Sequence, residues 1–328
     1  PHLFNSLSVV IPVLSSTFAS VGRFLKHAGN MSLGMLIIDE SGQAVPQSAL
    51  GAIYRTRRAV VVGDPLQVEP VVTIPKVLID ILADSTCVAN EYKVIENSAQ
   101  TFADNINEFN GMIGERQVGC PLVVHRRCIE PMFSISNLIS YDNRMFNKTN
   151  KKEEYLKPEN PFLIKKSGWI NVEGVENGGK DHFVKNQAER VCQLMEDAVY
   201  IYSDLFETDD KIFIITPFRT VAESMRKFII SYFSAKGYDK EILSKWTKNC
   251  VGTVHTFQGK DANEVLLVLG CSNKSAGAMN WVVKKANILN VACTRAKYRI
   301  AFIGNINDWK NRRYFREFIP NLIDIINV

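Results

Sequence analysis

Short runs of apolar, largely β-branched residues recur along the chain, and longer mixed segments separate them. The runs are continuous rather than alternating, which predicts strands that are buried on both faces, as in parallel sheets flanked by helices. The pattern therefore predicts an α/β fold. The strands are expected within residues 7–16, 35–40, 58–64, 119–124, 168–172, 211–217, 251–257, 264–270 and 298–304.

Helical segments are indicated by apolar residues at helical spacing, with start signals at Asn186 and Pro217. They separate the strands, as right-handed crossover connections require. The polar stretch 142–160 predicts a loop, and the boundary between two lobes is expected near residues 111–120, which gives lobes of 1–118 and 119–328. The helices are expected at residues 76–84, 96–110, 129–140, 184–204, 219–235 and 307–326.

Composition indicates a globular protein and excludes some classes. With 328 residues and 46% hydrophobic content, the chain is long enough for two domains with full cores. The seven cysteines include no C-x-x-C pair, which argues against a disulfide framework and a zinc site and favours a reducing compartment, cytoplasmic or, in a eukaryote, nuclear. No apolar run is long enough to span a bilayer, so no membrane partner is expected. The net charge of +5 is compatible with nucleic acid but common in proteins that bind none.

Polar residues suited to catalysis follow two of the predicted strands. Asp39 and Glu40 come directly after an apolar run, where an Asp can hold Mg²⁺ and the next carboxylate can orient and deprotonate an attacking water. Asp64 ends the next run, and Gln67 lies three residues further on, where its amide can reach a phosphate or that water. The alternatives are an exposed acidic strand end and an ordinary Gly-Asp-Pro turn.

Two arginines and one polar turn complete the candidate set. Arg127 and Arg295 each lie just after a strand or helix start, and a guanidinium suits the negative charge that phosphoryl transfer spreads over the γ-phosphate. Gln258, Gly259 and Asp261 form a polar turn between two buried runs, and a carboxylate in such a turn can accept hydrogen bonds from ribose hydroxyls. The alternatives are surface arginines and an ordinary hairpin-like connection.

A phosphate-binding loop is missing from the sequence upstream of Asp39. The only G-x-x-x-x-G-K segment is 174–180, but Asp181 stands where Ser or Thr binds Mg²⁺, and the segment follows the Asp-Glu pair instead of preceding it. We interpret residues 173–183 as a polar connection into a helix. Because the chain also starts on Pro1, we expect a fragment, with the missing N-terminal part of the same protein as a partner.

Taken together and in order, these segments resemble motifs of the superfamily 1 helicases, in particular the Upf/Sen-like branch. The resemblance extends from about residue 8 to about residue 305. DESGQA resembles the magnesium and general-base motif, GDPLQVEPV resembles GDxxQLxPV, FQGKD resembles FQGxE, and LNVACTRAK resembles LNVALTRAK. VLSSTFASV, LVVHRRC and TPFRTVAESMRK resemble a nucleic-acid-contacting segment, an arginine-finger segment and the TPYxxQ segment.

The resemblance implies two RecA-like P-loop NTPase lobes, a partial first lobe and a complete second one, with ATP between them. It implies an ATP-dependent helicase or translocase on single-stranded DNA or RNA. This chain is then the C-terminal part of that protein, and we expect it to be inactive on its own. The implied roles are Asp39 for Mg²⁺, Glu40 as general base, Gln67 as γ-phosphate sensor, Arg127 and Arg295 as arginine fingers, and Gln258, Gly259 and Asp261 at the nucleotide. The implied contacts to the nucleic-acid backbone are Ser16, Thr17, Ser20, Thr216, Thr253 and His255.

Three departures from the family pattern bear on these roles. Val221 or Ala222 stands where the family has Gln, and Asp261 replaces a longer Glu. Arg126 occupies the position of an aromatic residue that stacks on adenine, so either Arg126 stacks there instead or base recognition is weaker. A second hypothesis is a non-hydrolysing nucleic-acid- or protein-binding module that retains the helicase fold. The coding sequence upstream of Pro1 distinguishes the two, since only the motor needs a phosphate-binding loop there.

Overall fold

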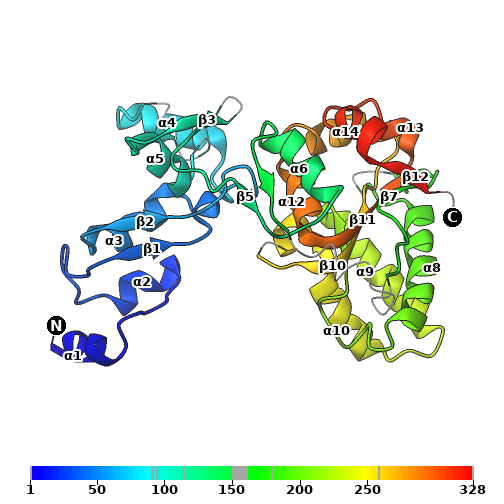
Figure 1. Ribbon diagram of the computed structural model, residues 1–328, viewed down its shortest axis with the longest axis horizontal. Coiled ribbons are helices and arrows are strands. Elements are labelled where there is room, and N and C mark those ends of the chain that lie inside the picture. Colours follow the sequence, from blue (N-terminus) through cyan, green and yellow to red (C-terminus); the bar gives the residue numbers. More distant parts are fainter. Residues whose placement is uncertain are drawn as a thin grey trace. The chain divides into compact units, whose positions relative to one another are not determined.

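The computed structural model describes residues 2–89, 92–93, 95, 97–113, 116–149, 162–178, 181–257 and 259–326. The chain divides into two units, Pro1–Pro121 and Leu122–Val328, which we call the first unit and the second unit. Helices alternate with parallel strands in both, and the second unit contains a parallel sheet flanked by helices (Figure 1). The predicted α/β class is therefore confirmed.

The first unit contains a small parallel sheet. Strand β1 (Leu36–Ile38) pairs with β2 (Ala59–Val61), and helix α3 (Pro46–Tyr54) connects the two. Buried apolar residues form two small clusters, one around Val21 and one around Ile38. The other elements of this unit are α1 (His2–Val10), α2 (Phe18–Phe24), the 3₁₀ helix η1 (Ser41–Gln43), α4 (Lys76–Ser85), α5 (Ala99–Ile106), β3 (Gly111–Ile113) and β4 (Arg116–Val118).

The second unit is built on a six-stranded sheet in which all neighbouring strands run parallel, in the order β12-β7-β11-β10-β8-β9. The central strands are buried on both faces, which explains their unbroken apolar runs. The strands are β7 (Gly168–Asn171), β8 (Ile212–Thr216), β9 (Val251–Thr253), β10 (Ala262–Val268), β11 (Ala296–Gly304) and β12 (Asp324–Ile326). A separate short sheet pairs β5 (Val124–His125) with β6 (Phe146–Asn147).

Helices cover the sheet of the second unit (Figure 1). Helix α12 packs against α6, and α9 packs against α8 and α10. Aromatic side chains fill the core: Trp169 stacks on Phe302 with 5.8 Å between ring centroids, and its Nε1 donates to the Gly304 carbonyl at 2.8 Å. The helices are α6 (Met132–Ser140), α8 (Lys185–Ile201), α9 (Arg219–Ser234), α10 (Lys240–Cys250), α11 (Ala276–Val282), α12 (Asn287–Arg295), α13 (Ile306–Trp309) and α14 (Phe315–Leu322).

The strand predicted at residues 7–16 is wrong. Helix α1 extends to Val10, and residues 11–17 have no regular structure. Its side chains from Ser6 to Val10 are exposed. A strand is stable only beside a neighbour that completes its hydrogen bonds. No strand of the described chain pairs with this run, and helical hydrogen bonds satisfy the backbone only in its α1 part.

Other predicted elements need smaller corrections. The single helix expected at 307–326 is replaced by α13, α14 and the edge strand β12. Only Val124 of the strand expected at 119–124 is in a strand. The region 111–118 holds a short antiparallel hairpin, with residues 114–115 outside the described chain. Besides α1, five α-helices of the described chain were not predicted: α2, α3 and α10 to α12.

The loop expected at residues 142–160 is partly wrong, because residues 146–147 form strand β6. Residues 150–160 of that stretch lie outside the described residues. Residues 173–183 connect β7 to α8, as expected, with Gly179 and Lys180 outside the described chain. Among the helices that the structure describes, none has the length and apolarity needed to cross a membrane.

Candidate functional site

Asp39 and Glu40 lie at the carboxyl end of β1, and both side chains are exposed. Glu40 has a left-handed backbone, with φ 52°, and its N–H donates to Asp39 Oδ1 at 2.9 Å. Glu40 Oε2 accepts a hydrogen bond of 3.1 Å from Gln43 Nε2. The unusual backbone turns two consecutive carboxylates toward solvent at the strand end, where ligands of parallel α/β sheets bind.

Two glycines bring the end of β2 against the Asp39-Glu40 turn. A Cβ at Gly63 would lie 2.6 Å from the Gly42 nitrogen and 2.6 Å from Ser41 Oγ, and one at Gly42 would lie 2.6 Å from the Asp64 carbonyl oxygen. The backbones can approach this closely because neither position carries a side chain. The ends of β1 and β2, which the sequence predicts as separate sites, therefore lie side by side.

Gln67 belongs to the same strand-end region. Its Nε2 donates to Asp64 Oδ2 at 3.0 Å, and Asp64 Oδ1 accepts from the Leu66 N–H at 2.8 Å. Gln67 is half-buried. The carboxylate of Asp64 therefore holds the turn and orients the Gln67 amide. Gln67 thus lies at the end of β2, the strand next to the one that ends at Asp39.

A buried polar chain supports this region from behind, and the sequence reasoning missed it. Ser41 Oγ lies 2.6 Å from Gln100 Oε1 and 2.8 Å from the Val62 carbonyl oxygen. Gln100 Nε2 donates to Asp104 Oδ1 at 2.8 Å, and that oxygen also accepts from the Gly119 N–H at 3.1 Å. Two polar residues four apart on the otherwise apolar face of α5 were the available signal.

Ser16, Thr17 and Ser20 gather at the start of α2. Thr17 occupies the N-cap position, its Oγ1 donates to Ser20 Oγ at 3.3 Å, and Ser16 Oγ donates to the Thr17 carbonyl oxygen at 3.3 Å. Ser16 and Thr17 are exposed and Ser20 is half-buried. Small hydroxyls at a helix start can donate to phosphate oxygens without reading a base.

Arg126 and Arg127 follow β5 in the second unit. Arg126 is exposed and Arg127 half-buried, and within the described chain neither guanidinium forms a hydrogen bond or an ion pair. The neighbouring His125 is held by the Cys128 N–H, which donates to Nε2 at 2.9 Å. Burial, aided by the charge of Arg127, lowers the pKa of His125. Both arginines remain available to an anionic ligand.

Arg295 is placed differently, at the end of α12 with only 1% of its surface exposed. Its Nη1 donates to the carbonyl oxygens of Lys260 at 3.0 Å and Phe257 at 3.4 Å. In this structure the guanidinium therefore holds the 257–260 turn from inside. An arginine finger has to reach the phosphate of a bound nucleotide, so that role requires this turn to rearrange.

The predicted nucleotide turn follows directly. Gly259 is exposed and has φ 76°, a backbone conformation that suits glycine. Asp261 pairs with Lys297 at 2.8 Å, and both side chains are partly buried. Gln258 lies outside the described residues. The ion pair joins the FQGKD segment to the TRAK segment, so Lys297 is a further residue that the sequence reasoning missed at this turn.

The remaining candidates lie at the carboxyl edge of the six-stranded sheet. Thr216 ends β8 and Thr253 ends β9, and the two are partners in the strand register. Thr216 is buried at 1% exposure, Thr253 is half-buried, and His255 is exposed on the 3₁₀ helix η3 (Val254–Phe257). Desolvation of the ring lowers the pKa of His255. Of these three candidates, Thr253 and His255 are therefore the accessible ones.

Comparisons with known proteins give consistent matches. Residues 108–307 match a family described as an AAA domain, and residues 4–74 match a second family with the same description. The probable helicase senataxin of Mus musculus is 23% identical over 328 residues, which cover 97% of this chain and 11% of that protein. An uncharacterized ATP-dependent helicase of Methanocaldococcus jannaschii is 23% identical over 331 residues, covering 97% of this chain and 42% of the relative.

The ATP-dependent helicase upf1 of Schizosaccharomyces pombe is 23% identical over 294 residues, covering 87% of this chain and 28% of that protein. The chain thus spans between 11% and 42% of the length of these relatives. Among solved structures, the helicase of PRRSV aligns with a TM-score of 0.37 and 11% identity, covering 88% of this chain and 37% of the other.

Proposed function

The chain belongs to the AAA domain family and to the superfamily 1 helicases of the Upf/Sen type, and we propose that the whole protein couples ATP hydrolysis to movement on single-stranded DNA or RNA. The observation that carries this proposal is the pair of strand ends in the first unit. There, exposed Asp39 and Glu40 meet the turn that orients Gln67. An acidic pair and an amide at adjoining strand ends suit a hydrolytic nucleotide site.

We propose that Asp39 holds Mg²⁺ and that Glu40 is the general base. Carboxylate oxygens suit Mg²⁺, and the ion, when bound, would supply positive charge to offset the charge of the phosphates. Glu40 is exposed, so an attacking water can reach its carboxylate. Gln67 senses the γ-phosphate. Arg127 neutralises the charge that develops there, and its guanidinium is not engaged by other side chains of the described residues.

The second unit supplies the other proposed contacts. Arg126 stacks on the adenine, and Gly259 and Asp261 line the nucleotide together with Gln258. Arg295 is proposed as a second finger that acts after the 257–260 turn opens, since it is buried against that turn. Ser16, Thr17, Ser20, Thr216, Thr253 and His255 are proposed to contact the backbone of the strand.

We further propose that residues 1–328 alone hydrolyse ATP negligibly. Their only G-x-x-x-x-G-K segment, 174–180, lacks the Ser or Thr that binds Mg²⁺. The described remainder of that segment belongs to the connection between β7 and α8. ATP turnover by residues 1–328 that equals the turnover of the full-length protein contradicts this proposal.

The proposed compartment is reducing, cytoplasmic or nuclear. All seven cysteines are free thiols, and five of them are buried in the second unit. Disulfides are rare in reducing compartments, whereas buried free thiols are common there. Localisation of the tagged full-length protein in its own cells tests this proposal.

The deciding experiment measures ATP turnover by the full-length protein with and without single-stranded DNA or RNA. Glu40→Gln removes the proposed base while keeping the size of the side chain, and we expect turnover to fall roughly a hundredfold or more. Glu108→Gln, at an exposed position of the same unit, is the matched control and should leave turnover unchanged. If Glu40→Gln turns over ATP like the unaltered protein, the site assignment is wrong.

The same experiment separates the motor from a non-hydrolysing binding module. A module of that kind retains salt-sensitive binding to single strands and shows no stimulated turnover in the full-length protein. The internal engagement of Arg295 and the Asp261–Lys297 ion pair are the observations that favour it. Fluorescence anisotropy with labelled DNA and RNA oligonucleotides at two salt concentrations provides the binding measurement.

A further inference from the structure

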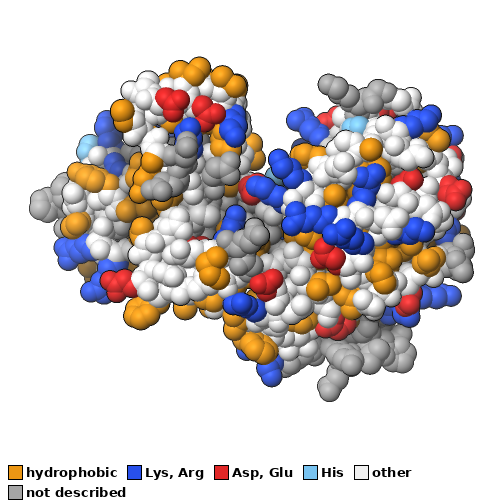
Figure 2. All heavy atoms as spheres, turned by 90° about the horizontal axis from the view of Figure 1, so that it is seen from above, with side chains coloured by type: hydrophobic (Ala, Val, Ile, Leu, Met, Phe, Trp, Pro, Cys, Tyr) orange, Lys and Arg blue, Asp and Glu red, His pale blue; other side chains and the backbone are white. Residues whose placement is uncertain are grey.

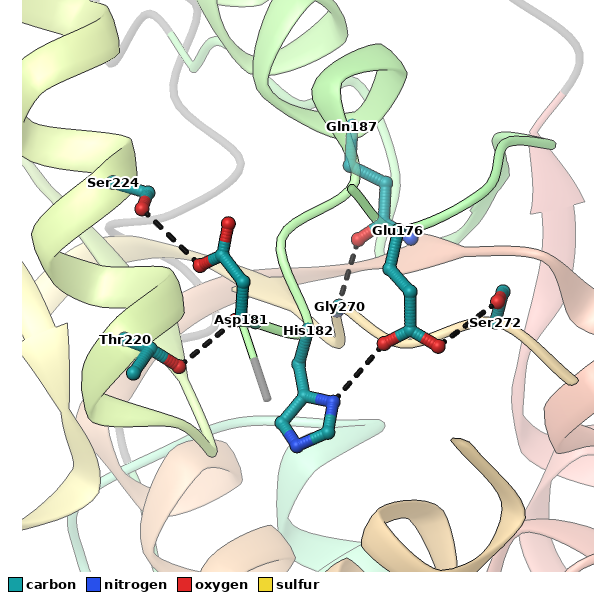
Figure 3. A network of polar contacts seen from close by, with 8 residues as sticks. All are labelled: Glu176, Asp181, His182, Gln187, Thr220, Ser224, Gly270 and Ser272. Atoms are coloured by element: carbon teal, nitrogen blue, oxygen red, sulfur yellow. Dashed lines mark hydrogen bonds and ion pairs between the residues drawn. The ribbon is translucent and has the colours of Figure 1, made fainter. Parts of the chain in front are cut away.

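Glu176, His182 and Cys271 converge at the carboxyl edge of the second unit, outside the site described above. The Glu176 carboxylate, a ring nitrogen of His182 and Cys271 Sγ all lie within 4.8 Å of one another. Glu176 and Cys271 are buried, and His182 is half-buried. Figure 3 shows the His182 ring turned toward the Glu176 carboxylate, with Nδ1 3.0 Å from Oε2.

The three residues come from two segments that end at the same edge of the sheet. Glu176 and His182 lie in the connection after β7, whose ends are joined by a bridge between Glu176 and Val184. Cys271 follows β10, and its N–H donates to the His182 carbonyl oxygen at 2.9 Å. The two segments are therefore locked together by backbone as well as side chains.

Backbone strain is concentrated in this cluster. His182 has φ 54° and Cys271 has φ 57°, in the left-handed region that side chains other than glycine rarely adopt. Gly270, with φ 62°, lies between the strand and Cys271, and a Cβ there would lie 2.8 Å from the His182 carbonyl oxygen. Two strained residues that both point a metal-binding atom at one carboxylate suggest a functional demand.

We propose that Glu176, His182 and Cys271 form a binding site for a zinc-type transition-metal ion. One thiolate, one imidazole and one carboxylate are a donor set that Zn²⁺ prefers, whereas Mg²⁺ and Ca²⁺ prefer oxygen alone. The sequence lacks the C-x-x-C spacing of common zinc sites. The fold brings these three ligands together from two separate segments. The spacing of cysteines in the sequence therefore could not reveal the site.

Charge balance favours an ion at this buried position. A divalent cation, one thiolate and one carboxylate sum to zero, with a neutral imidazole as third ligand, so the filled site carries no net charge into the interior. Binding releases the thiol proton to solvent and forms the metal–sulfur bond. Water or a serine hydroxyl completes the four ligands, and Ser272 Oγ is already 3.1 Å from Glu176 Oε1.

An ion at this site would fix the start of helix α9. Asp181, adjacent to His182, accepts a hydrogen bond at its carbonyl oxygen from Thr220 Oγ1 at 2.9 Å, and Ser224 Oγ lies 3.5 Å from its carboxylate. The ring of Phe218, just before α9, packs on His182 with 4.9 Å between centroids. The ion therefore has a structural role at the sheet edge and does not depend on the proposed ATP site.

The test uses Co²⁺ as a spectroscopic probe on the full 328-residue chain, stripped of metal with a chelator. Exposed Cys87 and Cys120 are first replaced by Ser, because exposed thiols bind Co²⁺ on their own. We expect one equivalent of Co²⁺ with a thiolate charge-transfer absorption that Zn²⁺ abolishes. Zn²⁺ at a hundredfold excess over Kd should raise the Tm of the second unit by about 5–10 °C.

Variants assign the ligands. Cys271→Ser should remove the charge-transfer absorption and the Tm shift, and His182→Gln should weaken Co²⁺ binding roughly a hundredfold or more. Cys192→Ser, a buried cysteine in α8, is the matched control and should keep both signals. Circular dichroism of each metal-free variant shows that it is folded. Failure of the folded starting chain to bind Co²⁺ at micromolar concentration, or an absorption that persists in Cys271→Ser, overturns the proposal.

Discussion

The two units achieve order in different ways. The second unit has a large apolar core around its six parallel strands, and Trp169, Phe302 and Phe315 are fully buried in it. The first unit has one pair of short parallel strands, one short antiparallel hairpin and two small apolar clusters. It instead depends on a buried polar chain through Ser41 and on glycine contacts.

The surface reflects the same difference. Among the described side chains, large apolar residues are exposed on every α-helix of the first unit, although not in the central turns of α5. Residues of β1 and β2 are exposed as well, such as Ile37 at 66% and Val60 at 44%. Hydrophobic side chains are visible over the surface in Figure 2. A core that leaves its strands exposed gains little free energy from burial. The geometry of the Asp39-Glu40 turn therefore depends on specific polar contacts.

The largest effect is expected for Phe302→Ala in β11. Phe302 is 0% exposed and contacts Trp169, Phe315 and Phe318. We expect the free energy of unfolding of the second unit to fall by about 3–5 kcal/mol, because the cavity is enclosed on all sides. All four tryptophans lie in this unit, so tryptophan fluorescence during urea unfolding reports it selectively.

The comparison predicts a smaller loss for Ile38→Ala in β1. Ile38 is 3% exposed, but its cluster is bordered by partly buried residues that can settle into the space. A loss of about 2 kcal/mol is expected, measured by hydrogen exchange of peptides that cover β1. Equal losses for the two variants would mean that the first unit has a core as enclosed as that of the second.

The fold of the second unit was largely predictable, because unbroken apolar runs and helical spacing coincide with elements that really are buried. Strand β10 and helix α9 lie close to their predicted ranges. The run at residues 7–16 has the same composition and becomes a helix and irregular chain. Composition shows that a segment can form a strand, but only a neighbouring strand makes it one.

The candidate site was predictable where a residue follows a strand. Asp39, Gln67 and Thr253 lie at strand ends or in the turns after them because parallel topology leaves these positions at one edge of a sheet. The burial of Arg295 was not predictable, since its partners are backbone carbonyls of a distant turn. A motif identifies a residue type but carries no information about its solvent exposure.

A pH-dependent effect should follow from Glu264 in β10 and sharpen the contrast between the units. Its carboxylate accepts from the N–H groups of Leu163 and Ile164 at 2.8 and 2.7 Å and from the Tyr202 hydroxyl at 2.8 Å. Burial raises its pKa to about 7, against these hydrogen bonds. Since the folded pKa exceeds the unfolded value of 4.5, its contribution to stability is full below pH 4.5 and is lost as pH rises to 7.

The measurement is the unfolding free energy of the second unit, followed by tryptophan fluorescence between pH 4.5 and 7. Glu264→Gln should make the decline with rising pH shallower by at most about 1.4 kcal/mol per pH unit, the limit for one proton. Glu223→Gln, in an exposed ion pair with Arg219, should leave the slope unchanged. Parallel pH profiles for the unaltered chain and Glu264→Gln would show that Glu264 does not titrate in this range.

The smallest effect in free energy is expected for Ser41→Ala, yet it tests the polar design of the first unit most directly. Loss of the hydroxyl removes the group 2.6 Å from buried Gln100 Oε1, and we expect a cost of about 1–2 kcal/mol from that unsatisfied oxygen. Ser32→Ala, at an exposed position of the same unit, should cost less than about 0.5 kcal/mol. Hydrogen exchange should rise in the 36–44 and 59–67 peptides together, because Ser41 joins the two strand ends. Faster exchange confined to one of these peptides, or equal effects of the two variants, would mean that the apolar clusters rather than the polar chain hold the Asp39-Glu40 turn.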